Sequence, residues 1–227
     1  PYGVRPQPGP GVRHVGTITD GPPGEHITDR TVSEALQYIE AHRNEPFYLN
    51  LWLYSVHGPW QHKENDTAVF AQRRDPTGRQ NNPVMASMLK TVDDNLGRLV
   101  ARLDELGLSS NTLLIFYSDN GGNVHSWRAD DPKTRTIRPG HPLYETFQSY
   151  RRWAGDQPPT NNEPLREGKG RIYEGGIRVP LIVRWPGHVP AGVINSTVVG
   201  CVDLFPTILD ALGVPPPPGH VVDGVSF

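Results

Sequence analysis

Hydrophobic residues recur three and four positions apart in three segments of the chain, a spacing that aligns side chains on one face of an α-helix. This spacing predicts helices over residues 28–42, 84–106 and 203–212. Glycine follows the second and third of these patterns, at Gly107 and Gly213, where helices commonly end in a left-handed residue. We therefore expect three amphipathic helices, each covering a hydrophobic core.

Three shorter segments are apolar without a helical period. Residues 47–54, 112–117 and 179–185 are rich in aromatic and branched side chains, which favour strands buried on both faces. Helices and strands alternate through the first half of the chain. This order predicts an α/β fold with a mostly parallel sheet and helices on both of its faces.

The remaining segments are polar and rich in turn-forming residues. Glycine and proline number 24 each, which indicates long loops. Residues 60–81 are predicted to be such a loop. Residues 123–169 show no periodicity, and so long a stretch inside a compact domain is typical of a functional loop or an insertion.

Composition narrows the class of protein only modestly. A net charge of -2 over 227 residues gives no whole-chain reason to expect a nucleic-acid partner. The apolar stretches are strand-sized, so no membrane span is predicted. Cys201 is the single cysteine, which rules out an internal disulfide, and its apolar neighbours favour a buried, inert thiol.

Candidate chemistry begins where the apolar run 112–117 ends, because α/β sheets place ligands beyond the carboxyl ends of their strands. Asp119 and Asn120 follow that run and offer the hard oxygen donors that Ca²⁺ or Mg²⁺ prefers, beside two glycines that allow a sharp turn. An ordinary turn explains the same residues. His57 lies just past the run 47–54, where an imidazole can exchange a proton near neutral pH or simply lie on the surface.

A second polar segment surrounds Lys169, which is flanked by Gly168 and Gly170. The small neighbours would let the ammonium group and nearby backbone N–H groups approach an oxyanion closely. The segment lacks the spacing of a P-loop, and an exposed loop lysine is the alternative. Glu174 and Arg178, four residues apart, are expected to form a structural ion pair.

Taken together in chain order, these segments resemble the sulfatases of the alkaline phosphatase superfamily, in particular the formylglycine-dependent, arylsulfatase-like group. The resemblance implies an alkaline phosphatase-like fold and a sulfatase that cleaves a sulfated small molecule or glycan, commonly in the periplasm, outside the cell or in the lysosome. The residues that carry it are the stretches 46–49, 57–59, 117–122, 164–170, 173–180, 202–210 and 223–226.

The resemblance also implies a role for each matching residue. Asp119 and Asn120 resemble two ligands of a single divalent cation, usually Ca²⁺ and sometimes Mg²⁺. Lys169 resembles the lysine that contacts the sulfate, and His57 the histidine near the ester oxygen. These roles are chemically coherent, since a cation and an ammonium group stabilise charge on sulfuryl oxygens while an imidazole protonates the departing alkoxide.

The chain departs from this family in one respect. It contains no Cys-x-Pro-x-Arg or Ser-x-Pro-x-Arg motif, whose first residue becomes the formylglycine nucleophile, and no pair of Asp ligands after a strand. Asp93 and Asp94 lie within a predicted amphipathic helix and are expected to face solvent. We therefore expect residues 1–227 to be the central and C-terminal portion of one catalytic domain, with little activity without the missing remainder.

Two other functions remain open from the sequence. A phosphodiesterase or phosphonate hydrolase of the same superfamily would act on an ester of similar tetrahedral geometry. A non-catalytic relative would keep the scaffold to bind anionic glycans.

Overall fold

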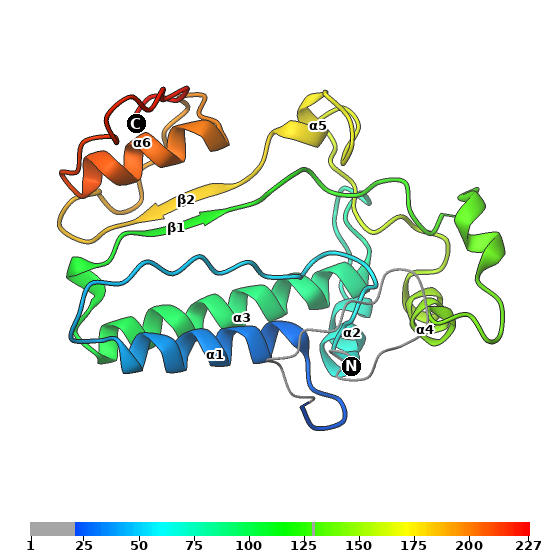
Figure 1. The fold of residues 1–227 in the computed structure, drawn as a ribbon. Helices are drawn as coiled ribbons and strands as arrows, with labels where there is room; N and C mark the ends of the chain where they lie inside the picture. Colours follow the sequence, from blue (N-terminus) through cyan, green and yellow to red (C-terminus); the bar gives the residue numbers. More distant parts are fainter. Residues whose placement is uncertain (1–20, 129) are drawn as a thin grey trace. The chain divides into compact units, whose positions relative to one another are not determined.

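The computed structural model describes residues 21–128 and 130–227, which form two compact units. The first unit ends at Val189, and the second runs from Pro190 to Phe227 (Figure 1). Among the described residues, no helix has both the length and the apolar character needed to cross a bilayer. Membership of both units in a single catalytic domain stays a prediction.

Two long helices form one layer of the first unit. Helix α1 (Ile27–Ala41) and helix α3 (Pro83–Glu105) confirm the helical patterns over 28–42 and 84–106. Asn82 begins α3 by accepting hydrogen bonds from the first backbone N–H groups, and Gly107 follows its end with a φ of 69°. The two helices pack through a small core of Ile39, Leu99 and Leu103.

The sheet differs from the prediction. Strand β1 (Leu114–Tyr117) pairs with β2 (Leu181–Arg184) in antiparallel register, so the sheet seen in the described residues is two-stranded and not parallel. The reason is topological: the long segment between the strands returns the chain to the end of the sheet that it left, so β2 runs back along β1. Leu114 packs on the core between α1 and α3, which places these helices on one face of the sheet.

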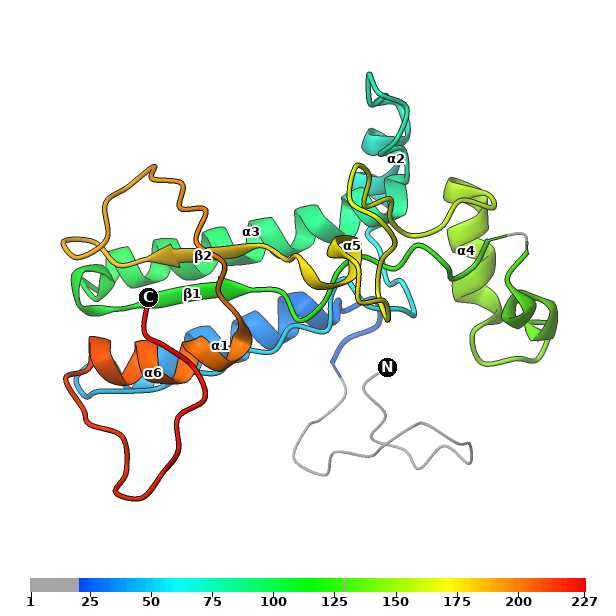
Figure 2. The same cartoon turned by 90° about the horizontal axis from the view of Figure 1, so that it is seen from above.

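Residues 47–54 are extended but form no strand in the described part of the chain (Figure 2). Phe47, Leu49 and Leu51 point toward the α1–α3 core, while Tyr48 and Trp52 are 71% and 83% exposed. Side chains therefore alternate with the period of a β-strand. The sequence predicted apolar contacts on both faces; the structure gives them on one, because the α1–α3 core covers one face and the other is exposed in the described residues.

Three elements lie in segments that were predicted to be loops. Helix α2 (Glu64–Ala71) lies within 60–81 and packs on α3. The segment 123–169 contains a 3₁₀ helix (Pro132–Thr136) and α4 (Tyr144–Ala154). Helix α4 was missed because its apolar positions are interspersed with arginines and it begins without a side-chain cap. Short elements over Ser109–Asn111 and Glu174–Ile177 (α5) complete the first unit.

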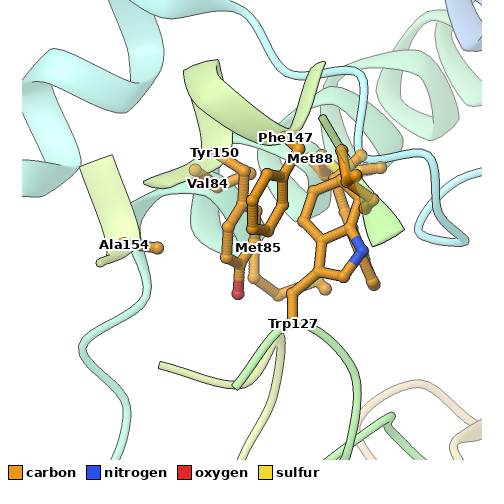
Figure 3. Packing of buried hydrophobic residues seen from close by; sticks show 9 residues of the cluster. Val84, Met85, Met88, Trp127, Phe147, Tyr150 and Ala154 are labelled. Carbon is orange, nitrogen blue, oxygen red and sulfur yellow. The ribbon is translucent and has the colours of Figure 1, made fainter. Parts of the chain in front are cut away.

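An aromatic core fixes α4 against the beginning of α3 (Figure 3). Trp127 makes edge contacts with Phe147 and Tyr150, with ring centroids 5.1 and 5.0 Å apart. The Tyr150 hydroxyl accepts a hydrogen bond from Asn82 Nδ2 at 2.8 Å and donates to the Gln157 carbonyl at 2.7 Å. The segment after β1 is therefore folded onto α3 and does not form a free loop.

The second unit is built around α6 (Cys201–Ala211), which confirms the helical pattern over 203–212. The Asp203 carboxylate accepts hydrogen bonds from the backbone N–H groups of Gly200 and Val225, at 2.7 and 2.8 Å. Both bonds favour the ionised carboxylate and lower its pKa. Cys201 is exposed, contrary to the buried thiol expected from its neighbours, because nothing in the described residues buries any side chain of α6.

Candidate functional site

Strand β1 delivers Asp119 and Asn120 to the end of the sheet. The backbone N–H of Ser118 still bonds to the Pro180 carbonyl at 3.2 Å, so the two residues follow immediately after the last paired position. Asn120 Nδ2 donates to Asp119 Oδ1 at 2.7 Å, which sets the two side chains next to each other. Asp119 is exposed and Asn120 is half-buried. Two oxygen-bearing side chains are thus adjacent and accessible.

Gly121 and Gly122 allow a backbone-to-backbone contact that no other residue permits. The N–H of Gly121 donates to the Gly176 carbonyl at 2.9 Å. A Cβ atom at Gly121 would lie 1.8 Å from the Gly175 carbonyl oxygen, and one at Gly122 would lie 2.4 Å from Thr160 Oγ1. The glycines are therefore required by close packing as well as by the turn after Asp119–Asn120.

Lys169 also contacts this turn through its backbone. Its backbone N–H donates to the Gly122 carbonyl at 3.0 Å, and a Cβ at the preceding Gly168 would lie 2.3 Å from that carbonyl oxygen. The Lys169 side chain is half-buried and has no ion-pair partner among the described residues. The structure thus joins the two segments that the sequence singled out, although 47 positions separate Lys169 from Gly122.

Thr160 and Asn162 hold these segments together, and neither was identified from the sequence. Asn162 Nδ2 donates to the carbonyl oxygens of Gly122 and Glu167, at 2.9 and 3.0 Å. Both the backbone N–H and the hydroxyl of Thr160 donate to the Asn123 carbonyl. No periodicity marks these two residues in the sequence. Their one signal is that they directly precede the glycine-rich segment around Lys169.

Several charged residues lie close to Lys169 in the sequence and are paired with other side chains. Arg166 lies over the ring of Tyr173 at 3.8 Å, a cation–π contact. Glu167, which has a φ of 63°, places its carboxylate 3.8 Å from His125 and 3.9 Å from Arg171. Glu174 and Arg178 form the expected ion pair at 3.1 Å, and both side chains are exposed, so the pair contributes little to stability.

His57 lies apart from this contact network. Its Nδ1 atom is 2.6 Å from the Gly58 carbonyl and must carry the proton, since a carbonyl only accepts. This bond leaves Nε2 as the ring nitrogen available to another partner, and Tyr54 packs edge-on against the ring with the centroids 5.6 Å apart. Among the described residues, no hydrogen bond or ion pair links His57 to Asp119, Asn120 or Lys169.

The donor chemistry of Asp119 and Asn120 fits a hard divalent cation, but only in part. Calcium takes about six to eight oxygen ligands, and these two side chains supply two positions. Within residues 21–128 and 130–227, no group of three His, Cys, Asp or Glu side chains is arranged to hold a metal ion. Asp93 and Asp94 are exposed on α3, as expected, and lie outside the site.

Comparison with known proteins supports the resemblance. The sulfatase family model matches residues 5–214. Steryl-sulfatase of Mus musculus is 32% identical over 200 residues, covering 87% of this chain and 26% of that protein. N-acetylgalactosamine-6-sulfatase of Mus musculus is 28% identical over 204 residues, covering 89% of this chain and 32% of that protein. The chain thus spans about a quarter to a third of these relatives.

Solved structures agree with the sequence relatives. Ps i-CgsB in complex with k-i-k-neocarrahexaose is similar with a TM-score of 0.67 and 32% identity, covering 88% of this chain and 37% of that one. The PsFucS1 sulfatase from Pseudoalteromonas sp. is similar with a TM-score of 0.62 and 28% identity, covering 88% and 33%. Such neighbours imply an alkaline phosphatase-like α/β fold. On the match to its family model and on these relatives, the chain belongs to the sulfatase family.

Proposed function

We propose that these residues form part of the active site of an enzyme that hydrolyses sulfate esters with a single divalent cation, Ca²⁺ or Mg²⁺. Asp119 and Asn120 supply two of the cation's ligands, and Lys169 contacts the sulfate. The observation that supports this most is the hydrogen bond from the Lys169 backbone to Gly122. It connects an unpaired ammonium-bearing segment to the turn that carries two oxygen donors.

In this proposal Lys169 stabilises negative charge on the sulfate, and His57 transfers a proton to the leaving group. When bound, the cation stabilises negative charge on the sulfate oxygens. Lys169 adds a second positive charge, on a backbone that Asn162 and the close approach of Gly168 hold against Gly122. His57 keeps Nδ1–H bonded to the Gly58 carbonyl, and in its doubly protonated form its Nε2–H hydrogen-bonds the ester oxygen and gives its proton to the departing alkoxide, which leaves the neutral ring.

None of these residues is the nucleophile. We propose that the nucleophile is a formylglycine, generated from a Cys-x-Pro-x-Arg or Ser-x-Pro-x-Arg motif that the 227 residues do not contain. The remaining cation ligands have the same external origin in this proposal. The 227 residues alone are then expected to turn over little or no sulfate ester, and robust turnover by them would contradict that expectation.

The experiment compares ester classes in the full enzyme that carries these residues. Asp119→Ala and Lys169→Ala should each lower kcat/KM for an aryl sulfate by about a hundredfold or more, the usual effect of losing one preorganised electrostatic contact. Asp93→Ala, on an exposed face of α3, is the matched control and should change nothing. A preference for an aryl phosphate diester or phosphonate ester would favour the phosphodiesterase or phosphonate hydrolase alternative. Binding without turnover of either ester would favour a non-catalytic glycan binder.

A further inference from the structure

A pocket of about 390 Å³ adjoins the Lys169 segment in the first unit. Its volume lies within the range of roughly 300–1,000 Å³ that small-ligand sites occupy. Three stretches of chain line it: residues 79–82 before α3, 124–128 after the Asp119–Asn120 turn, and 157–167 before Lys169.

The pocket shares its walls with the candidate site. Thr160 lines the pocket and also holds the Asn123 carbonyl by two hydrogen bonds, at 3.1 and 3.0 Å. Glu167 lines it two residues before Lys169, and His125 lines it three residues after Gly122. A ligand whose sulfate lies at Lys169 therefore has this open pocket beside the same backbone segments.

The lining chemistry suits a hydroxylated ring. Its side chains are mainly amides and charged groups, and only a valine and two prolines are apolar. The charges are balanced, because Arg79 pairs with Glu163 at 3.3 Å and Arg128 pairs with Asp130 at 3.0 Å. Such a surface offers donors and acceptors to the hydroxyl groups of a sugar, whereas a steroid or a bare aryl group would make no hydrogen bond with them.

The first of the three walls is held in place before any ligand arrives. The Asp75 carboxylate accepts backbone hydrogen bonds from Arg79 and Gln80, at 2.8 and 2.9 Å. The Gln80 side chain donates to the Asn161 carbonyl in the third wall, and Asn82 Nδ2 donates to the Pro158 carbonyl at 2.9 Å. A wall fixed in this way binds a ligand at a lower entropic cost.

We propose that this pocket binds a sugar residue adjacent to the one that carries the sulfate ester, so that the substrate is a sulfated oligosaccharide or polysaccharide. This inference rests on the proposed function, because it assumes that the sulfate lies at Lys169. Gln80 and Arg128 contribute hydrogen bonds to the ring from two different stretches of the lining.

The test measures binding by calorimetry in the presence of Ca²⁺, in the full enzyme that carries these residues and with its nucleophile removed, so that no probe is hydrolysed. Three probes are used: a sulfated galactan hexasaccharide, the same hexasaccharide after desulfation, and nitrophenyl sulfate. Gln80→Ala and Arg128→Gln should each lower the affinity for both hexasaccharides by about five- to tenfold, the effect of one lost hydrogen bond, and leave the affinity for nitrophenyl sulfate unchanged. Lys169→Ala should lower the affinity for the sulfated hexasaccharide and for nitrophenyl sulfate, and leave the affinity for the desulfated hexasaccharide unchanged.

The matched control is Arg43→Ala, an exposed arginine just beyond α1 that does not line the pocket. Amide exchange of Trp127 and Tyr150 verifies that each variant keeps the aromatic core. Unchanged hexasaccharide affinity in both pocket variants overturns the proposal, as does a hexasaccharide that binds no more tightly than nitrophenyl sulfate. If the pocket variants behave as expected but Lys169→Ala affects no probe, the proposed function fails and the saccharide pocket stands.

Discussion

Asn162 Nδ2 lies 2.9 Å from the carbonyl oxygen of Gly122 and fastens the turn after β1 to the segment that leads to Lys169. The same nitrogen donates to the Glu167 carbonyl at 3.0 Å, so one amide group holds both sides of the contact. Asn162→Ala removes both bonds and should lower the free energy of unfolding by about 1–2 kcal/mol. It should also speed amide exchange at Lys169, because opening the contact becomes easier.

The control for this substitution is Asn50→Ala, at an exposed asparagine in the extended segment 47–54. It should leave both quantities unchanged. Equal exchange rates at Lys169 in Asn162→Ala and the parent chain would contradict the fastening role of Asn162.

Gly121 should tolerate no side chain. Gly121→Ala would place a Cβ atom 1.8 Å from the Gly175 carbonyl oxygen. The nearest atoms all belong to the backbone of Gly175 and Gly176, which leaves little room to relax. We expect a loss of about 3 kcal/mol or more in the free energy of unfolding, measured by urea denaturation. Gly97→Ala is the matched control, because no atom lies within 4 Å of its added Cβ on α3. That change should stabilise the chain by about 0.5–1 kcal/mol.

His62 should make the stability of the first unit depend on pH. Its ring bonds to Thr67 Oγ1 at 2.7 Å and to Ser149 Oγ at 3.0 Å, and burial lowers its pKa from the ordinary value of 6.5. Below pH 6.5 the unfolded chain therefore binds a proton that the folded chain resists. Stability should be full above pH 6.5 and fall as the pH drops below it.

The measurement is the free energy of unfolding of the parent chain and of His62→Gln between pH 5 and pH 8. The variant keeps polar atoms but does not titrate in this range, so its curve should be flatter. Parallel curves would show that His62 is not the titrating group.

Asp203 should make the stability of the second unit depend on pH with the same sign, although here the fold favours the charged form of the group. The N–H groups of Gly200 and Val225 lower the pKa of its carboxyl, so its stabilisation is present above the ordinary pKa of 3.8 and is lost as the pH falls through the lowered value. Asp203→Asn should speed amide exchange at Val225 at pH 6, whereas Asp223→Asn, at an exposed position, should not. Equal amide exchange rates at Val225 in Asp203→Asn and the parent chain would show that the Asp203 carboxylate does not hold Val225 in place.

The parts of the fold that follow from local pattern were predictable. The apolar spacing of residues 84–106 and the following Gly107 predicted helix α3, and the apolar run 112–117 predicted β1. The pairing of β1 with β2 was not predictable, because register and direction depend on where the segment 118–180 returns. Helix α4 was missed because its apolar positions are interspersed with arginines, and the partners that bury them, Trp127 and α3, are brought together only by folding.

The candidate site shows the same division. Asp119, Asn120 and Lys169 stand out because their residue types and glycine neighbours limit what they can do. Asn162 does not stand out, because its role consists of hydrogen bonds to carbonyl groups 5 and 40 positions away. Backbone carbonyls carry no sequence signature, so such a role becomes visible only once the chain is folded.

The extended segment 47–54 has a consequence for handling the chain in solution. Its peptide groups from Phe47 to Leu53 make no hydrogen bond with the rest of the described residues, and Tyr48 and Trp52 face outward. An open strand edge beside exposed aromatic rings is a template on which a second extended peptide can add. Concentrated samples should therefore self-associate through this edge, and a charged residue in place of Trp52 should keep them monodisperse.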